Sequence, residues 1–245
     1  MLDGRLPAGV VPNDVLLLPG GEIIINSGTP TARSLVVLGA DLEPLEELGD
    51  SVGREARTSF PDSANLLSAR LGAGDSAGSF LEVTRGYVPR LRVWNSSLGL
   101  RAGWLLRRDW YPAYTSGDED ARGRGLLPSQ APPLPVMTGA WLDGDLAWVV
   151  ASVPDPDWQQ DDPLKPDEPL LTVSSDGIPN LAIRDWSRYS DGMIEAIDVE
   201  SGRTFVRGRF KHDFSRSLGS GLLDQVAQDS LGDFVHTISR VKLQQ

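Results

Sequence analysis

Apolar and polar residues alternate from 91 to 94 and again from 100 to 106, with a turn-forming Asn-Ser-Ser-Leu-Gly segment between them. Alternation with a period of two residues is the pattern of a half-buried β-strand. The two segments therefore predict an antiparallel hairpin in which Trp104 faces the core. The same pattern predicts a second hairpin over 193–211.

Short apolar runs predict the remaining strands. Segment 145–153 is apolar at almost every position, which predicts a central strand covered on both faces. Six further segments are rich in β-branched or leucine residues and are bounded by turn formers, and each predicts a strand. They are 16–18, 22–26, 34–38, 79–84, 170–174 and 234–243, and segment 181–185 also predicts a strand.

Helical spacing is confined to a few places. Leucines and a valine recur at intervals of three and four residues between 42 and 52, which predicts a short helix near 41–58. Asp41 stands where an N-cap residue belongs. Further short helices are expected at 62–71 and 221–231.

Together these patterns predict an all-β or β-dominated α+β protein. Its antiparallel sheets are expected to be sandwich- or barrel-like, with two or three short helices and long irregular loops. The sequence contains no detectable repeat at the period of a solenoid or a propeller. Segments 110–135 and 154–169 lack any period. The chain is expected either to divide into β-rich parts at 1–125 and 126–245 or to form one continuous domain.

The amino-acid composition excludes several kinds of functional site. The chain has 245 residues and no cysteine, which excludes disulfides, thiolate metal sites and a cysteine nucleophile. The N-terminal sequence lacks the basic and apolar regions of a signal peptide. No apolar run reaches the roughly 20 residues that a membrane helix needs. The expected location is the cytoplasm, without membrane contact.

The net charge of −11 argues against general nucleic-acid binding, which requires a basic surface. Charge is distributed in blocks. Residues 1–83 and 126–200 carry net charges of −7 and −11, whereas residues 84–125 and 201–245 carry +4 and +3. Blocks of opposite sign are expected to pair, either within one subunit or between subunits.

One short string is typical of catalysis. Gly-Asp-Ser-Ala-Gly at 74–78 resembles the nucleophile elbow of α/β-hydrolase esterases, and the resemblance implies Ser76 as nucleophile with His212 or His236 as base. That elbow lies between a strand and a helix. Here the preceding segment is broken by glycines and the following one reads as a strand. We therefore expect a glycine turn and no catalytic residue at Ser76.

Aromatic residues in the two loops offer a different chemistry. Trp158, Trp110, Tyr111 and Tyr114 are candidates for stacking on sugar rings or for contacts with a protein partner. These residues motivate the alternative of a carbohydrate-binding module or a glycan-acting enzyme.

Acidic residues crowd the second loop. Asp155, Asp157, Asp161 and Asp162 are weak candidates for Ca²⁺ ligands, but the loop lacks the glycine of an EF-hand turn. A solvated acidic loop is the expected state. No cofactor motif is present, so we expect neither a metal nor a cofactor.

These observations favour a non-enzymatic structural or assembly protein that acts through protein–protein contacts. In its general sequence profile, although through no shared motif, the chain resembles structural proteins of tailed-bacteriophage particles, such as tail, baseplate or capsid-decoration components. This resemblance implies a place in a virion. The expected partners are other protein subunits, in a homo-oligomer or a multi-protein assembly. Loop 154–169 is expected to contact another chain through Trp158. The arginine-rich stretches 85–108 and 203–216 of the neighbouring subunit are expected to bind the acidic residues of the loop. A serine esterase is the second alternative.

Overall fold

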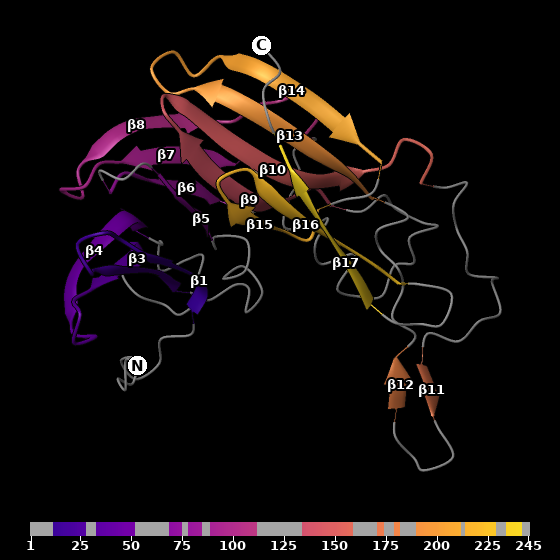
Figure 1. The fold of residues 1–245 in the computed structure, drawn as a ribbon, viewed down its shortest axis with the longest axis horizontal. Helices are drawn as coiled ribbons and strands as arrows, with labels where there is room; N and C mark the ends of the chain where they lie inside the picture. The colour runs from indigo at the N-terminus through magenta and orange to yellow at the C-terminus, as the bar shows by residue number, and fades with distance from the viewer. Residues whose placement is uncertain are drawn as a thin grey trace.

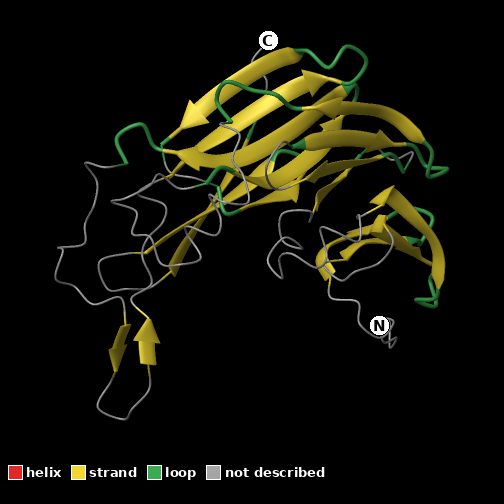
Figure 2. Ribbon diagram, turned by 180° about the vertical axis from the view of Figure 1, so that it is seen from behind, coloured by secondary structure: helices red, strands yellow, loops and turns green. Residues whose placement is uncertain are grey.

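The computed structural model describes residues 12–27, 33–51, 69–74, 78–84, 89–111, 134–158, 171–173, 179–181, 190–211, 214–228 and 234–241. Every helix or strand within these ranges is a β-strand, as Figure 2 shows. All strand pairs are antiparallel. The predicted β-dominated class is therefore confirmed, whereas the predicted helices are not found in the described residues. No helix in this part of the chain is long and apolar enough to span a bilayer.

Apart from one two-stranded ladder, the described strands form four sheets in chain order (Figure 1). Sheet 1 contains β1 (Pro12–Leu17), β2 (Ile23–Ser27), β3 (Arg33–Leu38) and β4 (Pro44–Ser51). Sheet 2 contains β5 (Ala69–Ala73), β6 (Phe80–Thr84), β7 (Arg90–Trp94) and β8 (Leu100–Leu105). Sheet 3 contains β9 (Val136–Asp143), β10 (Leu146–Pro154), β13 (Ser190–Asp198) and β14 (Thr204–Phe210). Sheet 4 contains β15 (Arg216–Gly219), β16 (Leu222–Gln228) and β17 (Phe234–Arg240).

A short separate ladder is formed between β10 and β13 in the sequence, by β11 (Leu171–Val173) and β12 (Pro179–Leu181). In each of the four sheets the strands are neighbours in chain order, once this ladder is left aside. Each sheet is thus a simple antiparallel meander, which needs only short connections between paired strands.

Consecutive sheets pack face to face and bury apolar side chains between them. Sheets 1 and 2 enclose one cluster that includes Ile24, Val37, Phe80 and Trp94. Sheets 2 and 3 enclose a second, with Leu81, Leu91, Val149 and Ile197. Sheets 3 and 4 enclose a third, with Trp148, Ile194 and Leu223. The predicted sandwich-like packing is therefore present, but it continues through four layers.

The first strands of the sheets contact one another in sequence, β1 with β5, β5 with β9 and β9 with β15. Two glycines permit this close approach. A Cβ atom at Gly72 would lie 2.3 Å from the Ala140 carbonyl oxygen, and one at Gly139 would lie 2.3 Å from Cβ of Ser217. Four-stranded meanders that contact one another through their first strands are the arrangement of β-propeller blades. Sheets 1 to 3 share this arrangement with four strands each, and sheet 4 has three described strands.

The position of sheet 3 explains the composition of its strands. Along β10 the odd-numbered residues, such as Val149, face sheet 2, and the even-numbered residues, such as Val150, face sheet 4. Both sets are buried. The predicted central strand at 145–153 is confirmed as β10, which lies between β9 and β13.

Both predicted hairpins are confirmed. β7 pairs with β8, and β13 pairs with β14, each in antiparallel register. Trp104 packs against the core but is only partly buried, because β8 is the outer strand of its sheet. Arg92 alternates with Leu91 and Val93, and such alternation is typical of a strand with one solvent-exposed face. Arg92 is nevertheless buried and forms a 3.0 Å ion pair with Glu82.

The predicted helix near 41–58 is wrong where the structure describes the chain, because 44–51 forms strand β4. The three leucines that produced the helical spacing have different roles. Leu48 is buried opposite Leu35 of β3, Leu45 is exposed, and Leu42 occupies a turn with a positive φ of 66°. Pairing with β3 overrides a pattern that is helical only by its spacing.

The predicted helix at 221–231 is also wrong, since 222–228 forms strand β16. Ser220 and Gly221 have φ values of 49° and 74°, and Gly219 pairs with Leu222. Positive φ at both central residues is the mark of a two-residue type I′ hairpin turn. The turn sends the chain back along β15 instead of into a helix. Most of the predicted helix at 62–71 lies outside the described residues, and 69–71 belongs to β5.

Candidate functional site: the outer edge formed by β8 and β14

A buried carboxylate fixes the geometry of this region. Glu195 lies on β13 and is fully buried. Its oxygens accept hydrogen bonds from Nε of Arg108 at 2.9 and 3.0 Å, from Nε1 of Trp110 at 3.2 Å, and from the hydroxyl of Thr204. These donors come from the segment after β8 and from the start of β14. Glu195 therefore ties sheet 2 to the outer strands of sheet 3.

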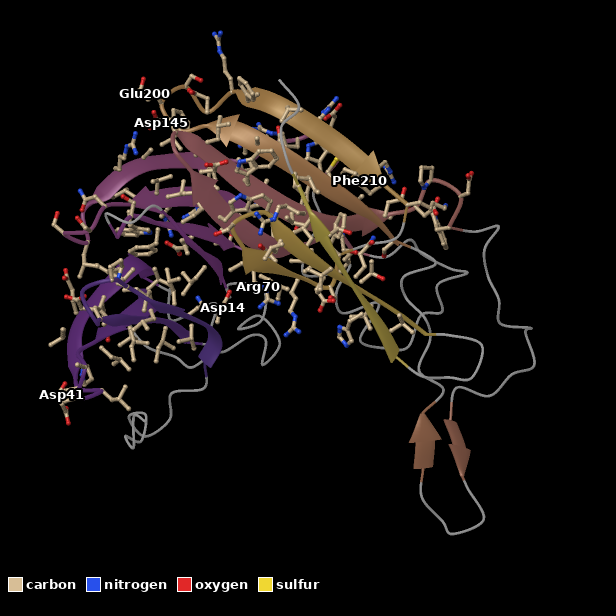
Figure 3. All side chains as sticks on the ribbon, in the orientation of Figure 1. Asp14, Asp41, Arg70, Asp145, Glu200 and Phe210 are labelled. Atoms are coloured by element: carbon tan, nitrogen blue, oxygen red, sulfur yellow. The ribbon has the colours of Figure 1, made fainter. Side chains whose placement is uncertain are left out.

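The turn between β13 and β14 is fixed against β8. The indole Nε1 of Trp104 donates to the carbonyl of Val199 at 3.2 Å. Gly202 has a positive φ of 67°, and a Cβ atom there would lie 2.7 Å from the ring of Trp104. Asp145 and Glu200 mark two neighbouring turns of sheet 3 in Figure 3, and Arg101 of β8 reaches Asp145 at 2.8 Å. β8 is thus tied to both turns, and we term the two outer strands, β8 and β14, the outer edge.

The two sides of β14 differ in chemistry. Arg207 and Arg209 lie on the side that faces sheet 2, where they pair with Asp109 at 2.9 Å and Asp191 at 2.6 Å. The hydrogen bond from Arg207, together with its positive charge, lowers the pKa of Asp109. The arginines on this side are therefore held in place by intramolecular partners.

Apolar side chains project from the outer edge into solvent. On β14, Phe205 is 64% exposed and Phe210 is 44% exposed. On β8, Leu100 and Leu105 are each at least half exposed. Phe210 also packs edge-on against Phe214, with ring centroids 5.6 Å apart, so its ring is held in position. Exposed aromatic side chains beside arginine are enriched in protein–protein interfaces.

Opposite charge blocks pair within the chain. Arg108 binds Glu195, Arg209 binds Asp191, and Lys211 binds Asp155. Each pair joins a basic block to the acidic block 126–200. Cations of the stretches 85–108 and 203–216 that were expected to receive acids of a neighbouring subunit therefore have partners inside this one.

Two of the predicted binding aromatics are not at the surface, which corrects that expectation. Trp110 and Tyr111 are buried in the cluster between sheets 2 and 3. The Trp110 ring donates to Glu195, and the Tyr111 hydroxyl donates to the carbonyl of Pro135 at 2.9 Å. Tyr114 lies outside the described residues.

The acidic loop is described only at its start. Trp158 is half-buried, and its amide donates to the carbonyl of Asp155 at 3.1 Å. The Asp155 carboxylate is buried, pairs with Lys211 and accepts the Asp157 amide at 2.8 Å. Burial alone would raise the Asp155 pKa, but the hydrogen bonds from Lys211 and from the Asp157 amide lower it. Within the described part of the chain no cluster of three His, Asp or Glu residues is placed to hold a metal, and Asp161 and Asp162 lie outside it.

The residues of the esterase-like string are only partly described. Ser76 and His212 lie outside the described ranges. His236 is on β17, and its Nδ1 contacts the Asp224 carboxylate at 3.0 Å, while Nε of Arg216 lies 3.1 Å from the same group. Burial alone would raise the Asp224 pKa, but the hydrogen bonds from His236 and Arg216 outweigh it and lower the pKa.

Neither a protein-family model nor a curated protein sequence matches the chain. Its fold is similar to the crystal structure of a member of the DUF4221 family from Bacteroides vulgatus, with a TM-score of 0.50 and 9% sequence identity. The similarity covers 96% of this chain and 65% of that one, so this chain spans about two thirds of the length of that protein. At this identity the similarity shows the fold alone.

Sequence reasoning missed the two features that build the outer edge. Glu195 stands in an apolar strand, and only its position opposite Arg207 and its hydrogen bond from Thr204 indicate a buried acceptor. The alternating pattern over 193–211 places Val206 and Phe210 on the apolar side of a half-buried strand, yet both are exposed. Only the place of β14 at the edge of sheet 3 shows that they face solvent.

Proposed function

We propose that this protein is a non-enzymatic structural part of a protein assembly, such as a tailed-phage particle, and that the outer edge is a surface by which it binds another protein. The observation that carries the proposal is the set of large apolar side chains exposed on the outer strand β14: Phe205, Val206 and Phe210.

The energetics support a contact at this surface. Burying apolar area yields about 25 cal/mol per Å², so several half-exposed large side chains offer a few kcal/mol to a partner. Glu195 and the Trp104 contact hold both strands in place before binding. A pre-organised surface loses little conformational freedom when it binds. The outer edge therefore has both the composition and the rigidity of a binding surface.

The glycan-binding alternative has less support. Trp110 and Tyr111, two of the residues expected to stack on sugar rings, are buried in the core. Trp158 is half-buried.

Site-specific photo-crosslinking tests the proposed function. A photoreactive phenylalanine analogue replaces Phe205 in the full chain, which is expressed in its own host. We expect one discrete protein adduct, and we expect its loss when Phe210→Glu is added. The matched control places the analogue at Asp41, an exposed turn position on sheet 1. Absence of a specific adduct at 205, or an equal adduct at 41, would contradict the proposal.

A fluorophosphonate probe separates this function from the esterase alternative. Because the residues after Gly78 form strand β6 and not the helix that an elbow requires, we expect no labelling of the intact protein. Stoichiometric labelling that disappears in Ser76→Ala would identify a serine nucleophile.

A further inference from the structure

Each sheet ends in an outer strand whose far edge pairs with no described strand: β4, β8, β14 and β17. An unpaired edge exposes a row of backbone donors and acceptors that another strand can bind. Proteins protect such edges with bulges, prolines and charged side chains. Three of these four edges are protected in this way.

β4 begins with Pro44, carries Glu46 and Glu47, and pairs with β3 through two irregularities in register. β8 carries Arg101 and pairs with β7 through one irregularity. β14 carries Arg207 and Arg209 and pairs with β13 through one irregularity. Each of these strands is twisted or charged in a way that discourages a further strand.

β17 lacks most of these protections. Its seven residues pair with β16 without any shift in register. From Phe234 to Ser239 the strand contains no proline, lysine, arginine, aspartate or glutamate. β17 therefore presents a regular and nearly uncharged edge.

β17 is also more exposed than its position in the sheet would suggest. It is the third strand of its meander, as β3, β7 and β13 are of theirs. Those third strands are almost wholly buried in their described positions, because a fourth strand and a neighbouring sheet cover them. On β17, Val235 is 46% exposed and Ile238 is 53% exposed.

We propose that β17 pairs antiparallel with β17 of a second copy of this chain, about a twofold axis at Thr237. The pairing joins two three-stranded sheets into one six-stranded sheet. In this register His236 lies opposite Ile238 of the second copy, and Val235 lies opposite Ser239. Both copies use the same residues, as a closed twofold interface requires.

Charge favours a second copy as the occupant. The only Lys, Arg, Asp or Glu within β17 is Arg240, at its end. In the proposed register the two Arg240 residues are six positions apart along the strands, about 20 Å, which exceeds the Debye length of about 8 Å at physiological salt. His236 contacts the Asp224 carboxylate of its own sheet, so any positive charge on its ring is balanced there. No like charges are placed opposite each other.

The inference is independent of the proposed function, because β17 belongs to sheet 4 and the outer edge belongs to sheets 2 and 3.

Sedimentation velocity of the full chain at micromolar concentrations tests the proposed pairing of β17. We expect a reversible dimer. Thr237 is exposed and lies on the twofold axis, so Thr237→Lys and Thr237→Glu should each place like charges opposite each other and weaken dimerisation about tenfold or more.

A mixture of the two variants provides the decisive test of the proposed pairing. An equimolar mixture of Thr237→Lys and Thr237→Glu should form a heterodimer at the concentration where each variant alone is monomeric, and such rescue cannot come from misfolding. Leu45→Lys, on the exposed edge strand β4, is the matched control and should leave dimerisation unchanged. A monomeric wild-type protein, a dimer indifferent to both charges at 237, or a failure of the mixture to associate would each overturn the proposal.

Discussion

Glu195 shows how a single buried charge organises its surroundings. Its carboxylate is fully buried and accepts hydrogen bonds from Arg108, Trp110 and Thr204. Glu82 has a similar environment in sheet 2, with Arg92 at 3.0 Å and Nε1 of Trp94 at 3.1 Å. Buried charge is tolerated only when it is paired and hydrogen-bonded. Both glutamates meet that condition with one arginine and one indole.

Glu195→Ala should therefore lower the free energy of unfolding by about 3–5 kcal/mol, because it leaves the Arg108 guanidinium and the Trp110 N–H without their acceptor. Urea denaturation measures the loss. The control is Asp145→Asn, which removes the exposed Arg101–Asp145 pair and should cost about 1 kcal/mol or less. Similar losses for the two variants would show that Glu195 does not hold the sheets together.

Gly202 offers a second prediction at the residue scale. Its φ is +67°, and a Cβ atom there would lie 2.7 Å from the Trp104 ring. Gly144 has a similar φ of +59° but no atom within 4 Å of a Cβ. Gly144→Ala should cost about 1–2 kcal/mol from backbone strain alone. Gly202→Ala should cost more and should shift the Trp104 fluorescence, whereas equal costs would mean that the ring moves aside freely.

At the scale of elements, Asp224 joins three strands of one sheet. Its buried carboxylate on β16 binds Arg216 of β15 and His236 of β17. The pKa of Asp224 is below its ordinary value of 3.8. A carboxyl group with a depressed pKa stabilises the folded state above the unfolded-state pKa. That contribution is lost as the pH falls through the lower, folded-state value.

The stability difference between the wild type and Asp224→Asn should therefore be full at pH 5 and above, and it should shrink as the pH falls below about 4. Hydrogen exchange of the β16 and β17 amides, followed at several pH values, reports on sheet 4 directly. A difference that stays constant down to about pH 2 would show that the Asp224 carboxylate contributes no charge-dependent stability.

Sequence periodicity predicted the strands well where it was sustained and failed where it was short. The β7–β8 and β13–β14 hairpins alternate over many residues, and both are found. The leucines at 42, 45 and 48 imitate a helix by spacing alone, yet one is in a turn, one is exposed and one is buried. The Ser220-Gly221 turn was a usable local signal, since Ser-Gly pairs favour tight turns. The segments on either side of this turn do not alternate between apolar and polar residues, so they did not predict the two strands that the turn connects.

At the scale of the whole molecule, the repeated sheets have no counterpart in the sequence. The first strands of the four sheets begin at residues 12, 69, 136 and 216, so the structural repeat has no constant period. Segments of different lengths separate the strands, including the β11–β12 ladder inside sheet 3. The outer edge depends on which strand lies outermost in its sheet. That property follows from topology and is invisible to residue-by-residue patterns.

Sheets 2 and 3 share a core that crosses residue 125. A fragment ending at residue 125 would expose the face of sheet 2 that includes Leu81, Leu91 and Val93, all fully buried in the intact chain. We therefore expect this fragment to aggregate or to lack a cooperative unfolding transition, as measured by circular dichroism. A soluble fragment that unfolds cooperatively would show that sheets 1 and 2 are an independent domain.

The serial packing of the sheets has a thermodynamic consequence. Each sheet shares a core cluster only with its neighbours in chain order, so the molecule behaves as a short one-dimensional array of units coupled to their nearest neighbours. In such an array an end unit that packs against a single neighbour opens at lower free energy than the middle units. Sheet 1 also buries Ile23, Ile25, Val36 and Leu38 on its other face. Among the described sheets, sheet 4 should therefore fray first, and a second chain docked on β17 would act as a cap on that end.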